Sequence, residues 1–115
     1  MKTGIELIKE ERKRQIEVEG WTAEHDSQYK KAELFHAACC YQAARRARAI
    51  WGENYLPIKS WPFDIEWWKP SPDNRVRELE KAGALFMAHN ESKGNEPIDQ
   101  WVEMCAKEID ELLAA

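Results

Sequence analysis

The segment SWPFDIEWWKPSPD, from Ser60 to Asp73, separates two helical halves of the chain. Its prolines lack a backbone donor and disfavour helical conformation in the residues that precede them, so the segment cannot form a helix. Disordered segments are poor in aromatic residues, whereas this one carries three tryptophans and a phenylalanine. We therefore expect an ordered loop over about 53–71, whose rings either fill the core or line a binding site.

Before this loop, the sequence predicts two helices joined by a short connection. The nearer helix spans about 27–51, with Asp26 or Ser27 as its N-cap and a middle rich in alanine and cysteine. Small side chains of this kind let another helix approach closely. The connection covers 21–26, and the helix ahead of it covers about 4–19. That first helix begins with a capping box formed by Thr3 and Glu6, and it ends at Gly20, which permits left-handed backbone.

After the loop, the sequence predicts two more helices. A third helix is expected over 72–93, because a proline suits the first position of a helix. Inside it, Gly83 costs about 1 kcal/mol relative to alanine, so we expect a close contact with another element there. A fourth helix begins at Pro97 and carries the most regular apolar stripe in the chain. Because no run of alternating β-branched residues indicates a sheet, the expected fold is all-α: one domain over 1–115, a small bundle of about four helices with the long tryptophan- and proline-rich loop between the second and third.

The composition of the 115-residue chain narrows the possible partners. A formal net charge of −4 argues against a protein that binds long nucleic acids, and no apolar run approaches the ~20 residues that span a membrane. Residues 1–14 are too charged for a signal peptide. An odd number of cysteines, with Cys39 beside Cys40, is untypical of a disulfide framework and favours small core residues in a reducing cytoplasm.

Two apolar surfaces predict self-association. The stripe of the fourth helix is broad, and the second helix has a face of small residues. A bundle of this length has too few elements to cover both faces, so we expect a homodimer or a higher homo-oligomer.

Acidic side chains offer one arrangement for a divalent ion. Glu33 and His36 stand at the i,i+3 spacing of helical di-iron sites, but such sites need that spacing twice, together with two further glutamates. A magnesium site that keeps several waters needs fewer ligands and could use Asp26, Glu33 and Glu91. The alternative interpretation is that these acids cap helices or face solvent.

A polar gap interrupts the apolar stripe of the first helix. Arg12 falls four residues after Ile8 and four before Ile16, and Gln15 lies on the same side. Polar groups on a core-facing stripe need partners when they are buried. Either the helix rotates so that Arg12 reaches solvent, or Arg12 and Gln15 face a pocket that the aromatic loop closes.

Five segments, in this order along the chain, resemble a family of small phage and prophage proteins: ERKRQ (11–15), EGWTAEHD (19–26), AELFHAACCY (32–41), WPFDIEWWKP (61–70) and LEKAGALFMAH (79–89). A weaker likeness is to the all-helical MazG-like nucleotide pyrophosphohydrolases. Those enzymes hold Mg²⁺ through ExxE and ExxD motifs on neighbouring helices. This chain departs from that pattern, since His36 follows Glu33 at i+3 and His89 stands where a third-helix glutamate is expected.

The resemblance and the residue chemistry together mark candidate ligand-binding residues. Tryptophan faces stack on nucleobases at about 1–3 kcal/mol per base, and arginine and lysine complement phosphate. Glutamine, aspartate and histidine can bind base or ribose edges. The candidates are Arg12, Arg14, Gln15, Trp21, His25, Asp26, Trp61, Trp68, Lys69 and Lys81.

These residues favour a protein that binds a small nucleotide without turnover, with no catalytic residue and no cofactor. A phage protein of this kind would act in the host cytoplasm and sequester a cyclic or ADP-ribose-type signal of a host defence system. One alternative is a Mg²⁺-dependent MazG-like nucleoside triphosphate pyrophosphohydrolase, with the metal on the three acids named above. The other is a module that inhibits host proteins by direct interaction, for which a shaped surface is sufficient.

Overall fold

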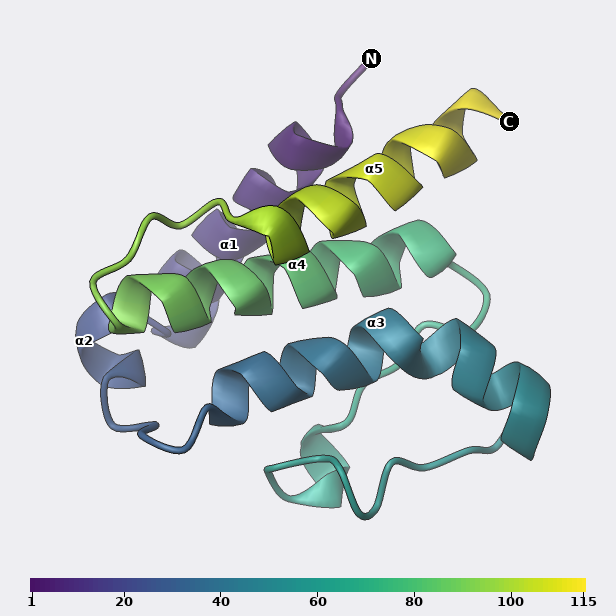
Figure 1. Ribbon diagram of the computed structural model, residues 1–115, viewed down its shortest axis with the longest axis horizontal. Coiled ribbons are helices and arrows are strands. Elements are labelled where there is room, and N and C mark those ends of the chain that lie inside the picture. The colour runs from purple at the N-terminus through teal and green to yellow at the C-terminus, as the bar shows by residue number, and fades with distance from the viewer.

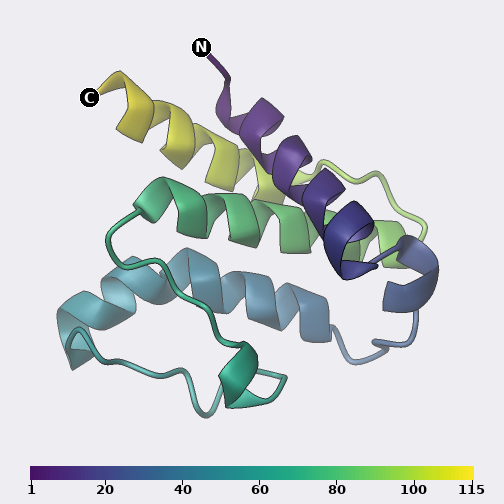
Figure 2. The same ribbon diagram turned by 180° about the vertical axis from the view of Figure 1, so that it is seen from behind.

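The computed structural model describes all 115 residues and consists of helices and loops without a strand, which confirms the predicted all-α bundle. Figure 1 shows α4 between α3 and α5, and Figure 2, the view from behind, shows α1 crossing over the same layer. The elements are α1 (Gly4–Glu19), α2 (Ala23–Asp26), α3 (Glu33–Trp51), a 3-10 turn (Ile65–Trp67), α4 (Arg75–Ser92) and α5 (Gln100–Ala114).

Helix α4 forms the centre of the bundle. It contacts each of the other four α-helices, and every residue from Ala82 to Ala88 is buried. A helix that is apolar over most of its circumference is expected in such a central position. The core is therefore organised around α4, and the other helices each bury one face against it.

The two apolar faces that predicted self-association are both covered within one chain. On α3, Ala37, Ala38, Ala44 and Cys40 are buried in the core, and Cys39 is half-buried. On α5, the stripe formed by Val102, Cys105 and Ile109 is fully buried. The homo-oligomer remains a prediction, but these two faces no longer support it.

The start of α3 differs from the prediction. The segment read as a connection contains α2, whose N-cap Thr22 accepts a hydrogen bond from the amide of His25. Neither Asp26 nor Ser27 caps α3, because both belong to the end of α2. The helix starts six residues later than expected, at Glu33, after Ala32 in left-handed backbone and without a side-chain cap.

The starts of α4 and α5 were also predicted too early. Pro72 lies in a turn, and α4 begins at Arg75 because the side chain of Asn74 accepts the hydrogen bond of an amide in the first turn. Likewise, Asp99 and not Pro97 sets the start of α5. A proline only fixes its own φ, whereas an Asn or Asp cap satisfies a backbone donor that would otherwise be unpaired.

The close contact predicted at Gly83 is present, and its partner is Ile8 of α1. A Cβ added at Gly83 would lie 2.5 Å from Cδ1 of Ile8, which is itself fully buried. Overpacking costs about 1–3 kcal/mol and outweighs the ~1 kcal/mol of helix propensity that alanine adds. We expect Gly83→Ala to lower the free energy of unfolding by up to about 2 kcal/mol in urea titrations, and by less in an Ile8→Val background. A Gly83→Ala protein more stable than wild type would contradict this packing.

The long loop is ordered by aromatic contacts with α3. Trp68 stacks on Tyr41 with ring centroids 4.6 Å apart, and Trp61 meets both rings edge-on. All three side chains are buried. Trp67, the neighbour of Trp68, is instead 57 % exposed. The loop therefore uses two of its tryptophans to extend the core and leaves the third at the surface.

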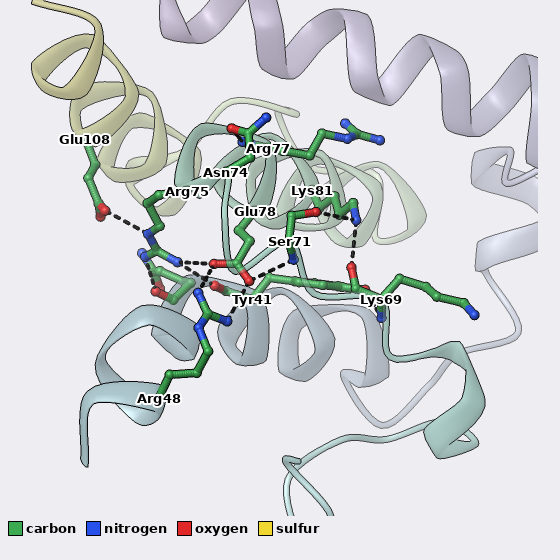
Figure 3. A network of polar contacts seen from close by, with 11 residues as sticks. Tyr41, Arg48, Lys69, Ser71, Asn74, Arg75, Arg77, Glu78, Lys81 and Glu108 are labelled. Carbon is green, nitrogen blue, oxygen red and sulfur yellow. Dashed lines mark hydrogen bonds and ion pairs between the residues drawn. The ribbon is translucent and has the colours of Figure 1, made fainter. Parts of the chain in front are cut away.

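A buried polar network fixes the end of this loop where it enters α4 (Figure 3). The carboxylate of Glu78, which is fully buried, accepts two hydrogen bonds from Arg48 of α3, at 2.7 and 2.8 Å, and one from the amide of Ser71. Nearby, the hydroxyl of Tyr41 accepts from the amide of Lys69 at 3.0 Å. These contacts hold the returning chain against α3 and α4.

Candidate functional site

A cleft of about 970 Å³ opens between the loop and the helices α1 to α4. Pockets of about 300–1,000 Å³ are typical of small-molecule sites, so this one is large for a chain of this size. Helix α1 contributes one polar side, α2 and the loop contribute rings, and α4 contributes cations. Eight of the ten candidate residues line it: Arg14, Gln15, Trp21, His25, Asp26, Trp61, Lys69 and Lys81.

Arg12 lies behind the cleft and does not line it. It is only 3 % exposed, so the interpretation that it reaches solvent was wrong. Its guanidinium binds Glu91 at 2.8 Å, Gln15 at 3.3 Å and Asp26 at 3.5 Å. Arg12 therefore holds in place two side chains that do line the cleft.

Trp68 is the other candidate that lies outside the cleft lining. At 6 % exposed and stacked on Tyr41, it belongs to the core. The two interpretations of the loop, that its rings fill the core or line a site, therefore apply to different residues. Trp68 fills the core, Trp67 lines the cleft, and the buried Trp61 contributes to both.

One side of the cleft is a continuous series of rings, which we call the aromatic wall: Tyr29, Phe63 and Trp61. The centroids of Tyr29 and Phe63 are 5.3 Å apart, and those of Phe63 and Trp61 are 5.8 Å apart, both edge-to-face. Sequence reasoning did not select Tyr29, which lies in an irregular segment without a motif. Phe63 was within the quoted aromatic segment but was not selected.

The cleft lining also includes two arginines joined by one carboxylate, which we call the guanidinium pair: Arg14 of α1 and Arg77 of α4. Glu11 accepts hydrogen bonds from Arg14 at 2.9 and 3.0 Å, and it pairs with Arg77 at 2.8 Å. Burial alone would raise the pKa of Glu11, but the hydrogen bonds from both arginines outweigh burial and lower it. Glu11 therefore stays ionised and tethers both cations.

Two lysines extend the cationic side. The ammonium of Lys81 donates to the carbonyl of Lys69 at 2.6 Å and lies 5.6 Å from the centroid of the Tyr41 ring. Burial and the neighbouring charge of Arg77 lower the pKa of Lys81. An anion bound in the cleft would relieve this repulsion. Lys69 lines the cleft with an exposed side chain.

Polar residues of α1 and α2 complete the lining. Nδ1 of His25 is 2.9 Å from Oδ1 of Asp26, whose side chain is buried. The side-chain oxygen of Gln15 accepts from Arg12. These contacts orient an imidazole and an amide at the cleft without occupying all of their hydrogen-bonding groups.

The three acids of the magnesium alternative are not arranged as a metal site. Asp26 and Glu91 both pair with Arg12, and Glu33 accepts a hydrogen bond from the amide of Lys31 at 2.6 Å. No three His, Cys, Asp or Glu side chains lie close enough together to hold a metal ion. Each acid therefore has a structural contact in place of a shared ligand position.

The fold and the cleft define a class: a small all-α bundle with an open cleft whose lining includes an aromatic wall, arginines and lysines. No protein-family model, curated protein or solved structure matches this chain. None of its helices combines the length and the apolar character needed to cross a membrane. The likeness to phage and prophage proteins rests on the five sequence segments alone and remains a prediction.

Proposed function

We propose that this protein binds a small nucleotide in the cleft and holds it without turnover. The observation that carries the proposal is that the aromatic wall and the guanidinium pair line one and the same cleft. Rings stack on bases of any sequence, and arginine matches the geometry of phosphate oxygens. A nucleotide combines both groups in one small molecule.

Binding without turnover is the version of this function that the contacts favour. Three of the four carboxylates that line the cleft, Glu11, Glu19 and Asp26, are paired with arginines. A carboxylate committed to a guanidinium is a poor ligand for Mg²⁺, which is held in such enzymes by free acids together with substrate phosphates. We therefore favour binding without turnover over the pyrophosphohydrolase alternative.

The biological role that we propose follows from the resemblance to phage and prophage proteins. A phage-encoded protein that binds a nucleotide tightly lowers the free concentration of that nucleotide in the host cytoplasm. Sequestration of a defence signal of cyclic or ADP-ribose type is such a role, and it needs no catalytic residue. Mass spectrometry of small molecules released from the denatured protein would identify the ligand directly.

A panel of mono-, di-, tri- and cyclic nucleotides tests the proposal. We expect at least one to quench tryptophan fluorescence and to raise the melting temperature by mass action. Trp67→Ala should weaken its binding about ten- to hundredfold, because Trp67 also lines the cleft and its exposed ring offers a further stacking face. The matched control is Trp51→Ala, since Trp51 is 73 % exposed but lies outside the cleft. If no nucleotide changes either signal, the proposal is wrong.

A second candidate function, a protein-interaction module, is favoured by one surface feature. Four large apolar side chains are exposed near the end of α3 and the start of the loop: Ile50, Trp51, Leu56 and Ile58. Clusters of exposed apolar residues often mark protein-interaction sites. This surface is separate from the cleft lining, so the two functions depend on different residues.

A further inference from the structure

The imidazole of His25 is held in one tautomer. Its Nδ1 lies 2.9 Å from Oδ1 of Asp26, and the buried Asp26 carboxylate is in turn 3.5 Å from the guanidinium of Arg12. An ionised carboxylate only accepts hydrogen bonds, so a neutral imidazole beside it carries its proton on Nδ1. The second nitrogen, Nε2, is left with a lone pair.

That lone pair is available to a ligand. The side chain of His25 is 41 % exposed and lines the cleft, and Nε2 forms no hydrogen bond within the chain. At this position the cleft therefore presents an acceptor, and a bound molecule gains a hydrogen bond there only if it brings a donor. Phosphate oxygens at neutral pH bring none.

The contacts of His25 connect it to two parts of the cleft lining. On one side, its ring centroid is 6.0 Å from that of Tyr29, the first ring of the aromatic wall. On the other, Asp26 connects through Arg12 to Gln15, which lies one helical turn after Glu11 of the guanidinium pair. In a nucleotide, the sugar joins the base to the phosphates.

We infer that the cleft selects ribonucleotides, with a sugar hydroxyl of the ligand donating a hydrogen bond to Nε2 of His25. Asp26 acts as a positioning residue that keeps Nε2 an acceptor. This inference rests on the proposed nucleotide-binding function and adds the class of sugar to it. The base and the number of phosphates are set by other parts of the cleft.

The test compares the four ribonucleoside 5′-diphosphates with their 2′-deoxy and 3′-deoxy counterparts at pH 8. For the tightest ribonucleotide, we expect removal of one of the two hydroxyls to weaken binding about three- to tenfold, as for loss of one hydrogen bond. In His25→Phe, which keeps a ring but lacks the acceptor, the ratio of the two dissociation constants should fall to about one. Asp26→Asn, which frees the tautomer, should lower the same ratio.

The control is His36→Phe, because His36 is an exposed histidine of α3 outside the cleft lining. It should leave the ratio unchanged. His25 is partly exposed, so an unaltered melting temperature checks that His25→Phe folds. Equal binding of ribonucleotides and both deoxynucleotides by wild type would overturn the inference alone, as would a ratio that survives in His25→Phe. Absence of any nucleotide binding by wild type would overturn the proposed function as well.

Discussion

Replacement of Trp68 by alanine is expected to remove about 3–5 kcal/mol of the free energy of unfolding, as large-to-small changes at buried aromatic residues do. The ring is stacked on Tyr41 and meets Trp61 edge-on with centroids 5.1 Å apart. Its loss leaves a cavity on the side of α3 that the loop covers. Because small domains are stable by only about 5–15 kcal/mol, the variant should melt about 10 °C or more below wild type.

Two variants separate the role of this ring from simpler explanations. Trp67→Ala removes the adjacent but exposed tryptophan, and its stability should change by only about 0.5 kcal/mol. Trp68→Phe should keep most of the stability, since the buried Nε1 of Trp68 has no hydrogen-bond partner to lose. Urea titration of the three proteins gives the comparison. A stable Trp68→Ala protein with weakened nucleotide binding would show instead that Trp68 contacts the ligand.

The contrast between Trp67 and Trp68 also shows where sequence reasoning ends. In a helix or a strand, periodicity tells which side chains face the core. This loop has no regular period, so neighbouring tryptophans could not be assigned to the core or the cleft from the sequence. The same limit applies to Tyr29, whose position depends on the irregular segment between α2 and α3.

Helix ends were predictable where one residue type decides them. Gly20 ends α1 in left-handed backbone as expected, and α3 ends at Trp51 before Gly52. The start of α3 follows Ala32 with φ of 59°, a conformation that an alanine gives no reason to expect. In the candidate site, the residues chosen from short sequence segments include most of those by which α1 and α2 line the cleft. The pairing of Glu11 with Arg77 joins α1 to α4 across the bundle, and no local pattern predicts it.

Among the charged residues, Glu78 is the one whose removal should destabilise the loop most directly. It is fully buried, and its carboxylate compensates Arg48, which is also buried, and Arg75 at 3.4 Å. Breaking a buried ion pair by removing one partner costs about 3–5 kcal/mol, because the remaining charge is left without compensation in a poorly solvated position. We expect a loss of this size for Glu78→Ala, measured by urea or thermal unfolding.

The same substitution should loosen the end of the loop, because the amide of Ser71 loses its acceptor. Faster hydrogen exchange at the amides of Lys69 and Ser71 would report this opening, and the side chains of Lys69 and Lys81, which line the cleft, would be less well held. Glu108→Ala is the matched control, since Glu108 also pairs with Arg75, at 3.0 Å, but is more exposed. Exposed pairs contribute about 0–1 kcal/mol, so Glu108→Ala should change little. If both variants lose the same small amount, Arg48 and Arg75 do not depend on the buried carboxylate, and the loop is held by its aromatic contacts alone.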